Sequence, residues 1–456
     1  MWDAEVDVVV AGAGGAGLVA ALAAAQKGLQ VALFEKTDHI LGNTAASAGM
    51  IPAAGTRFQK ELGIDETPED MAEDILKKNH YESDRDLTLA VCRASAPLIE
   101  WMYDDLNIEL SLVTEFKYPG HSNFRMHAPP SRSGLELVKR LRQNVSKFDN
   151  IFLMMKTPVV DLLTNEQNEV IGVVAESSEG KQRIKAKKVI LATNGFGGNK
   201  RMVEKYIPEI KDALYFGYEA NTGEGIEMAV NIGADVSNMT AYQGHSAVNE
   251  GSGILVTWGT IMMGGFMVNR NGKRFADETV GYSEFAVELL KQDGKHGYII
   301  FDQDIYDELL SHEDFKNLSQ SSAFKRAESP EKLAEELNID KANFVATFEQ
   351  FNKNEPGTPD EFGRENFAKK LRPPYYGVRV VPALFHTQGG LKINEHAQVI
   401  HKDGHVIKNL YACGGTAVGV SGKHAYGYMS GNGLLAALGF GKIAGDHVAQ
   451  AILNGE

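Results

Sequence analysis

Cysteine is scarce in this chain of 456 residues, which contains only Cys92 and Cys413. The two lie far apart in apolar stretches, so we expect buried thiols rather than a zinc or iron–sulfur framework, and no metal site. So few cysteines also predict a reducing compartment, the cytoplasm. The C-x-x-C-H motif of haem attachment is missing, and we expect no haem-bearing electron-transfer module within the chain.

Excess positive charge and long apolar runs are missing as well. The chain has 46 Lys and Arg against 60 Asp and Glu, a formal net charge of −14. Binding to nucleic acid or to an anionic membrane needs a basic surface, so we expect no nucleic-acid partner. No apolar run is long enough to cross a bilayer, so we expect no membrane insertion. The first recognisable motif starts almost at Met1, which predicts that no signal peptide precedes it.

The segment from Val6 to Lys36, VDVVVAGAGGAGLVAALAAAQKGLQVALFEK, has the pattern of a strand, a glycine turn, a helix and a second strand. Its glycines fit G-x-G-x-x-G: Gly12 allows the tight turn, Gly14 lets the backbone approach a pyrophosphate, and Gly17 brings the helix close to the sheet. Glu35 follows Gly17 by 18 residues, where a ribose-binding carboxylate belongs. These features together predict a dinucleotide site, which could hold NAD or FAD.

Changes in residue composition divide the rest of the chain into segments. A small-residue loop, DHILGNTAASAGM, follows the motif, and from Thr240 to about Phe385 the sequence becomes richer in Met and aromatic residues. The segment from Leu410 to Ala451 returns to a strand, a glycine loop and a long helix. A chain of this length exceeds one simple core. We therefore expect a discontinuous first domain, residues 1–240 and 386–456, and a second domain inserted at residues 241–385.

Several spaced motifs carry a family resemblance: AGAGGAG with FEK, LGNTAASAGM, VILATNGFGG, MVNRNGKRFADE, FHTQGGLKI, NLYACGGTAVG and SGNGLLAALGFGKIAG. With these motifs the chain resembles, over nearly its whole length, the flavoprotein family of soluble fumarate reductases and 3-ketosteroid dehydrogenases. The resemblance implies an α/β fold: a Rossmann-like FAD-binding domain of the glutathione-reductase type with an inserted α+β capping (clamp) domain. It also implies that the flavin ring lies between the two domains. No histidine stands just after LGNT, where membrane-bound relatives carry their attachment residue, so we expect noncovalent FAD.

The family's cofactor contacts carry over residue by residue. The glycine turn would hold the pyrophosphate, and Glu35 would bind the ribose. The C-terminal loops would approach the ribityl chain and the pyrimidine edge of the flavin. The positions implied are Gly12, Gly14, Gly15, Gly17, Glu35, Lys36, Gly42, Asn43, Thr44, Ser47, Gly49, Val159, Thr193, Gly195, Glu224, Gly414, Gly415, Asn432, Gly433, Leu434 and Leu435.

The active-site positions depart from the fumarate reductases. Tyr282 stands where those enzymes carry a proton-donating arginine, and the second arginine position falls at or next to Tyr428. Trp258 replaces a glutamate of the proton path. His245 and His386 correspond to the family's carboxylate-binding histidines. A dicarboxylate in a closed site needs guanidinium partners to offset its desolvation, so the losses favour another substrate.

Trp258 and three nearby apolar residues suggest a pocket for a larger, mostly apolar ligand with one carbonyl. These three are Met262, Met263 and Phe266. A second interpretation places them in the core of the cap, away from substrate.

The resemblance implies an FAD-dependent oxidoreductase acting on a carbon–carbon bond next to a ketone, either a 3-ketosteroid-type dehydrogenase or an ene-reductase. Hydride would be exchanged with flavin N5 and a proton with Tyr282, while Tyr428 and a backbone N–H of the loop 431–433 would hold the carbonyl oxygen. The partners are then a ketone or enone and an unidentified electron donor or acceptor. The direction of the reaction stays open.

Other interpretations stay open too. The chain could reduce a small unsaturated acid such as fumarate or urocanate, with Arg125, Arg132 or Lys423 replacing the lost clamp, or it could bind flavin without turnover. Tyr426 could take the role of Tyr428, and Tyr282 could be a half-buried cap residue. His245 and His386 could be structural. Tyr81 and Tyr118 could reach a substrate, and we expect Arg274 to pair with a local acid.

Overall fold

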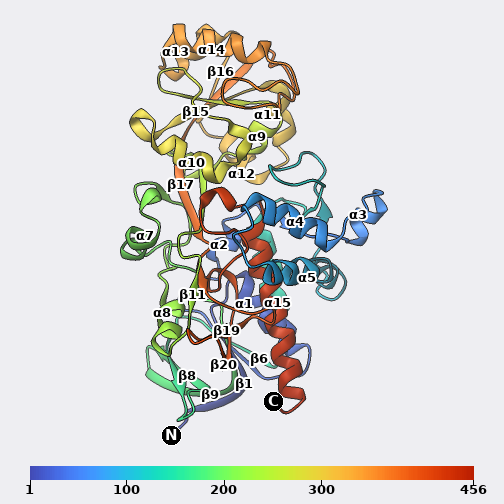
Figure 1. Ribbon diagram of the computed structural model, residues 1–456, viewed down its shortest axis with the longest axis vertical. Helices are drawn as coiled ribbons and strands as arrows, with labels where there is room; N and C mark the ends of the chain where they lie inside the picture. Colours follow the sequence, from blue (N-terminus) through green and yellow to red (C-terminus); the bar gives the residue numbers. More distant parts are fainter.

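The computed structural model describes residues 1–456 and has two parts, a body that contains both termini and a cap at the opposite end (Figure 1). The body is built on an eight-stranded sheet of order β19-β20-β9-β1-β2-β6, which β8 and β7 extend from β9. Strands β20, β9, β1, β2 and β6 run parallel, whereas β19, β8 and β7 pair antiparallel with their neighbours. The strands are β1 (Ala4–Ala11), β2 (Val31–Phe34), β6 (Ile151–Met154), β7 (Val159–Thr164), β8 (Val170–Ser177), β9 (Gly180–Leu191), β19 (Gln398–Ile400) and β20 (Val406–Ala412).

Two helices pack tightly against each other beside this sheet. They are α1 (Gly15–Ala25), which follows the glycine turn, and the C-terminal α15 (Asn432–Leu453). A Cβ atom on Gly441 or on Gly445 would lie 2.6 Å from a carbonyl oxygen of α1, so glycine at both positions permits the close contact. Gly441 lies next to Ala16 and Gly445 next to Ala20, so the two helices run in the same direction.

Three further helices and a set of short helices and strands complete the body. α4 (Pro68–Lys78) packs on α5 (Arg85–Asp104), α5 packs on α15, and α6 (Gly134–Val145) packs on α1. The short elements are α2 (Gly42–Ala45), α3 (Arg57–Glu61), α7 (Lys200–Tyr206), α8 (Glu224–Asn231), β3 (Ile51–Pro52), β4 (Ser111–Leu112), β5 (Met126–Ala128), β11 (Val236–Ser237) and β18 (Gly390–Leu391).

The cap is built on a second, largely antiparallel sheet of order β13-β12-β17-β15-β14, with β10 and β16 also paired to β17. Its strands are β10 (Leu214–Tyr215), β12 (Tyr242–Asn249), β13 (Ile254–Leu255), β14 (Phe266–Asn269), β15 (Gly297–Asp302), β16 (Phe324–Ala327) and β17 (Tyr375–Thr387). Its helices are α9 (Gly259–Met262), α10 (Tyr282–Leu290), α11 (Gln303–Leu309), α12 (Glu313–Ser319), α13 (Pro330–Leu337) and α14 (Lys341–Lys353).

The strand β17 joins the two parts. Its first residues pair with β15 and β16 inside the cap, and its last residues pair with β12 and β10 next to the body (Figure 1). Apolar side chains form one large core in the body and a separate core in the cap, the latter drawing mainly on residues between Ala247 and Val380. The expected α/β fold with a Rossmann-like body is confirmed, while the boundary expected between residues 385 and 386 stays a prediction because β17 is continuous there.

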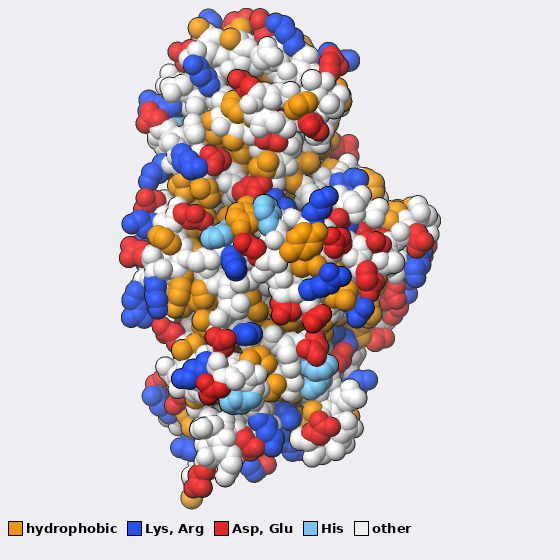
Figure 2. Space-filling model, viewed as in Figure 1, with side chains coloured by type: hydrophobic (Ala, Val, Ile, Leu, Met, Phe, Trp, Pro, Cys, Tyr) orange, Lys and Arg blue, Asp and Glu red, His pale blue; other side chains and the backbone are white.

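The surface agrees with the charge balance of the chain. On the face drawn in Figure 2, basic side chains are interspersed with acidic ones rather than gathered into one patch. No helix combines the length and the apolar character that crossing a bilayer requires.

Candidate active site

One cavity runs from the glycine turn of the body to the cap. Its lining includes most positions expected for the cofactor: Gly12, Gly14, Gly15, Glu35, Lys36, Gly42, Asn43, Thr44, Ser47, Val159, Thr193, Glu224, Gly414, Gly415, Gly433 and Leu434. Four of the residues expected to act on substrate, Tyr282, Tyr428, His245 and His386, line the same cavity, as does Trp258. The fold therefore brings together segments that are hundreds of residues apart in the sequence.

The three glycines of the turn play different geometric parts. Gly12 has a φ of +104°, and a Cβ there would lie 2.3 Å from the carbonyl oxygen of Ala192. A Cβ on Gly17 would lie 1.8 Å from the carbonyl oxygen of Gly12, so this glycine sets the helix–turn packing. A Cβ on Gly14 would meet no atom within 4 Å, and Gly14 lines the cavity. Open space next to Gly14 is what a pyrophosphate close to the backbone requires.

The two helix N-termini at the cavity lack side-chain caps. Gly14 is the N-cap of α1 and Gly431 that of α15, and neither helix has a side-chain hydrogen bond at its N-cap. The first backbone N–H groups of a helix have no partner within the helix, and the helix dipole favours negative charge there. These two ends can therefore receive a phosphate group and the electron-rich edge of a ring.

Carboxylates order the nucleotide end of the cavity. The Glu35 carboxylate accepts hydrogen bonds from Ala13 N at 3.1 Å and from Thr37 N at 3.0 Å, so it ties β2 to the glycine turn. Glu224 accepts from Lys36 Nζ at 2.7 Å. Burial works to raise the pKa of Glu224, but the hydrogen bonds from Lys36 and Thr222 outweigh it and lower the pKa. Glu224 is thus an ionised carboxylate next to Lys36.

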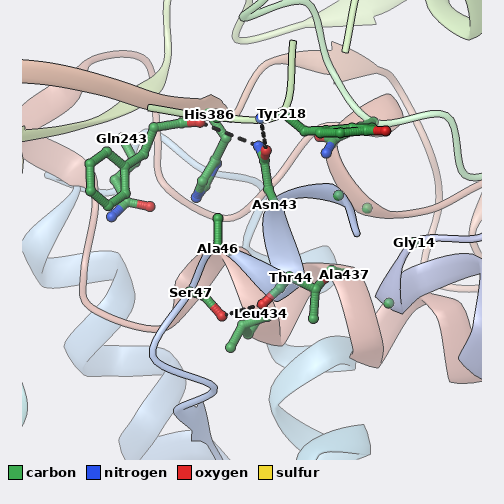
Figure 3. Close-up of a pocket in the computed structure, with 18 of the residues that line it drawn as sticks. Gly14, Asn43, Thr44, Ala46, Ser47, Tyr218, Gln243, His386, Leu434 and Ala437 are labelled. Atoms are coloured by element: carbon green, nitrogen blue, oxygen red, sulfur yellow. Dashed lines mark hydrogen bonds between the residues drawn. The ribbon is translucent and has the colours of Figure 1, made fainter. Parts of the chain in front are cut away.

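Asn43 organises the middle of the cavity (Figure 3). Its side-chain oxygen accepts from Tyr218 N at 2.7 Å and from Asn221 Nδ2 at 2.9 Å, and its amide nitrogen donates to Phe385 O at 3.3 Å. Ser47 Oγ donates to Thr44 O at 2.7 Å, which closes α2 below it. Through these three bonds Asn43 ties α2 to Tyr218, Asn221 and Phe385.

Aromatic side chains form the cap end. The Tyr282 ring lies 6.1 Å from Tyr428, 6.2 Å from Tyr118 and 6.2 Å from Trp258, measured between ring centroids. The side chains of Tyr282, Tyr428 and Ser430 line the same end of the cavity. Gly433 N donates to the Tyr428 hydroxyl at 3.4 Å. The site therefore clusters hydroxyl donors next to a backbone N–H.

These tyrosines are protonated at neutral pH. Burial, reinforced by Tyr428 and Tyr118, raises the pKa of Tyr282 well above its usual value. Burial also raises the pKa of Tyr428, and that of Tyr118 to about 12. Each hydroxyl is thus available as a hydrogen-bond donor or an acid, and none is a ready base.

The two expected histidines are neutral. Burial lowers the pKa of His245 to about 3 and that of His386 to about 4. Ala247 N donates to His245 Nδ1 at 3.1 Å, so the proton of His245 lies on Nε2. His245 stacks on Tyr282 at 4.3 Å, and His386 lies 5.6 Å from Tyr428. Both can offer a neutral hydrogen bond, but neither brings a positive charge to the cavity.

Three apolar residues expected at the substrate lie outside the cavity lining, so their contact with a substrate stays a prediction. Phe266 is fully buried in the cap core and stacks on Phe351 with ring centroids 4.3 Å apart. Met262 and Met263 pack against the same core, and none of the three lines the cavity. Phe266 begins β14, which pairs with β15 inside the cap, and α9, which ends at Met262, packs on both strands.

Five expected cofactor residues lie behind the cavity wall rather than in it. They are Gly17, Gly49, Gly195, Asn432 and Leu435. Gly49 has a φ of +67° and would clash with Ser133 if it carried a Cβ, and Asn432 Nδ2 donates to Ser421 Oγ at 3.1 Å. These residues support the lining residues through packing and hydrogen bonds.

The structure separates the alternatives for the second tyrosine and the basic residue. Tyr426 donates to Glu82 at 2.9 Å, outside the cavity, so Tyr428 alone faces Tyr282. Arg125 is fully buried and binds the carboxylates of Glu66 and Asp74.

Of the other cations considered, Lys423 does not line the cavity and Arg132 does. The Arg132 guanidinium is bonded to Glu115 at 3.0 Å. Arg274 pairs with Glu278 at 2.7 Å and holds the cap together, as expected.

Some lining residues had no recognisable signal in the sequence. Tyr118 reaches the cavity, whereas Tyr81 is exposed and bonded to Glu73. Asp314, in α12 of the cap, and His312, the N-cap of that helix, also line the cavity. No local pattern marks these residues, because only the docking of the cap on the body brings them to the site.

A model of the FAD binding domain family matches residues 7–434, which is most of the chain. The chain belongs to this family. It is 32% identical over 453 residues to a probable fumarate reductase of Shewanella frigidimarina. The aligned region covers 98% of this chain and 75% of that protein.

Two solved structures are similar to this flavoprotein over almost its whole length. One is the open conformation of a flavocytochrome c3 fumarate reductase, with a TM-score of 0.82, 31% identity, and coverage of 99% of this chain and 79% of that chain. The other is 3-ketosteroid-Δ4-(5α)-dehydrogenase from Rhodococcus jostii in complex with 4-androstene-3,17-dione, with a TM-score of 0.77, 26% identity and 98% coverage of both chains.

The protein is therefore an FAD-dependent oxidoreductase of the fumarate reductase and ketosteroid dehydrogenase type, which acts on carbon–carbon bonds. The open cradle at Gly14 and the two uncapped helix N-termini fit FAD, and these groups would hold its pyrophosphate and the pyrimidine edge of its flavin. Noncovalent attachment stays a prediction.

Proposed function

We propose that this flavoprotein acts on a carbon–carbon bond next to a ketone, as an enone reductase or a 3-ketosteroid-type dehydrogenase. The observation that supports this is the position of Tyr282 and Tyr428 side by side, with ring centroids 6.1 Å apart, in a cavity end that offers no unpaired cation. Burying a dicarboxylate there would leave its charges without guanidinium partners. A ketone needs only the neutral donors that are present.

The carbonyl oxygen is held by Tyr428 and Gly433. Gly433 N donates to the Tyr428 oxygen at 3.4 Å, which leaves the tyrosine proton free to point at a ligand. A ketone oxygen that accepts the Tyr428 proton, and to which Gly433 N turns from its long contact with Tyr428, receives two neutral donors where negative charge develops in the transition state. Removing one such donor typically costs about 10²–10³ in rate.

Tyr282 transfers the proton at the carbon next to the ketone. Its raised pKa keeps the hydroxyl protonated, which favours the direction in which an enone is reduced. Ser430, in the loop that precedes α15, lines the same cavity as Tyr282. FAD, when bound, supplies hydride exchange at the carbon beyond.

The test is anaerobic photoreduction of the flavin, followed by mixing with 4-androstene-3,17-dione, the compound named in the similar structure, or with fumarate. We expect the steroid enone to reoxidise the flavin and fumarate to leave it reduced. In Tyr282→Phe the reoxidation should slow by about 10²–10⁴ with FAD retained. Tyr426→Phe, the same change outside the cavity, should react like the parent. Reoxidation by fumarate alone would contradict the proposal.

A reductase of a small unsaturated acid such as fumarate or urocanate is the second candidate. The similarity to fumarate reductases favours it, and so does the presence of His245 and His386 in the cavity. It requires Arg132 to exchange Glu115 for a substrate carboxylate. Arg132→Gln should then abolish reoxidation by fumarate, whereas the ketone reaction should persist.

Other features of the proposal come from the sequence. We assign the cap to residues 241–385 and propose a separate electron donor or acceptor, because the chain contains no haem-attachment motif. The small number of cysteines supports a cytoplasmic location.

A further inference from the structure

We propose that Asp314 forms a second binding subsite, at the cap end of the cavity, for a hydrogen-bond donor that the substrate carries far from its ketone. The substrate class is then an elongated, mostly apolar ketone with a hydroxyl or an amine at its distal end. This inference rests on the proposed function, since it describes the other end of the same ligand.

Asp314 lies at the far end of a series of aromatic rings that starts at the reactive tyrosines. The series runs from Tyr428 to Tyr282, Tyr118, Phe116 and His312, with consecutive centroids 5.0–6.2 Å apart. Asp314 follows two residues after His312, and both line the cavity that contains Tyr282. The cavity thus extends from the loop before α15 to α12 of the cap.

The cation nearest to this end of the cavity is not available to Asp314. Arg132 NH2 binds Glu115 at 3.0 Å and its NH1 binds Ser111 at 3.2 Å. His312 is buried, which lowers its pKa and keeps the ring neutral. The Asp314 carboxylate takes part in no hydrogen bond or ion pair, and burial next to Glu313 raises its pKa to about 6. At neutral pH it is a largely ionised acceptor without a donor.

The wall between the two ends is mostly apolar. Leu255, Trp258 and Met126 line it, together with every ring of the series except Phe116, which lies behind Tyr118 and His312. A pocket with a few polar groups at fixed positions orients a ligand through those groups and binds its body by contact. A partly buried carboxylate without partners favours a ligand donor, because a hydrogen bond to a charged group is stronger than one between neutral groups.

A matched ligand pair tests the subsite. The probes are 4-androstene-3,17-dione and its counterpart in which the 17-ketone is reduced to a hydroxyl. Binding is read from the absorbance change of the oxidised flavin, and turnover from reoxidation of the photoreduced flavin. We expect the parent to bind the hydroxyl compound about 10- to 150-fold more tightly, the range for one hydrogen bond to a charged group.

Asp314→Asn should remove this preference, and Glu313→Gln, an exposed neighbour outside the cavity, should keep it. Equal binding of both steroids by the parent, an undiminished preference in Asp314→Asn, or binding of neither steroid would overturn the inference. If the steroids bind with the expected preference but do not reoxidise the flavin, the subsite is supported and the proposed reaction fails. The two readouts therefore separate the two proposals.

Discussion

Replacing Gly14 by alanine should weaken FAD binding while leaving the fold intact. Gly14 has φ −69° and ψ −177°, which any residue adopts, and a Cβ there would meet no protein atom within 4 Å. The methyl group would instead occupy the space in which the pyrophosphate approaches the N-terminus of α1. Losing one hydrogen bond to the charged phosphate costs about 1.5–3 kcal/mol, which corresponds to about 10- to 150-fold weaker binding.

Gly17→Ala is the matched comparison. Its Cβ would lie 1.8 Å from the carbonyl oxygen of Gly12, so the helix would have to move and we expect a loss of about 3 kcal/mol or more in the free energy of unfolding. The assay is titration of the apoprotein with FAD by calorimetry, together with thermal unfolding without FAD. The reasoning is refuted if Gly14→Ala binds FAD as tightly as the parent, or unfolds as easily as Gly17→Ala.

Three further expectations concern stability. Phe266→Ala should cost about 3–5 kcal/mol in urea unfolding and leave ligand affinity unchanged, because Phe266 lies in the cap core; altered affinity in the folded variant would contradict this placement. Glu278→Gln should cost about 3–5 kcal/mol, because it leaves the buried Arg274 without its main partner, and an unchanged denaturation midpoint would count against it. Burial lowers the pKa of His127 to about 4 and that of His245 to about 3, from 6.5. Below pH 6.5 the unfolded chain binds more protons, so stability should fall by about 1.4 kcal/mol per histidine and pH unit down to pH 4. Urea midpoints that stay constant between pH 7 and pH 5 would exclude this contribution.

The parts of the site that could be predicted are those built from local sequence. Gly12, Gly14 and Glu35 stand in one short strand–helix–strand unit, where spacing alone fixes which residue meets a dinucleotide. Phe266 shows the limit of such reasoning. Its sequence neighbourhood is shared with pocket residues such as Trp258, but the pairing of β14 with β15 turns it into the core.

The family motifs predicted that Tyr282 and Tyr428 face a substrate, and the cavity contains both. They did not predict the protonation states, because a pKa depends on burial and on neighbouring rings. Tyr118 illustrates this: it has no motif, yet its ring lies 6.2 Å from Tyr282 and contributes to the raised pKa of that residue.

By itself the sequence determined a dinucleotide site, because glycine spacing and a buried strand act over a few residues, and the family motifs along the chain narrowed the cofactor to FAD. Only the tertiary structure decided the chemistry of the substrate end. The cap places Tyr282 against Tyr428 and brings Asp314 to the same cavity from α12, and it leaves every nearby cation paired. These contacts join residues far apart in the chain, so they exist only once the cap has docked on the body.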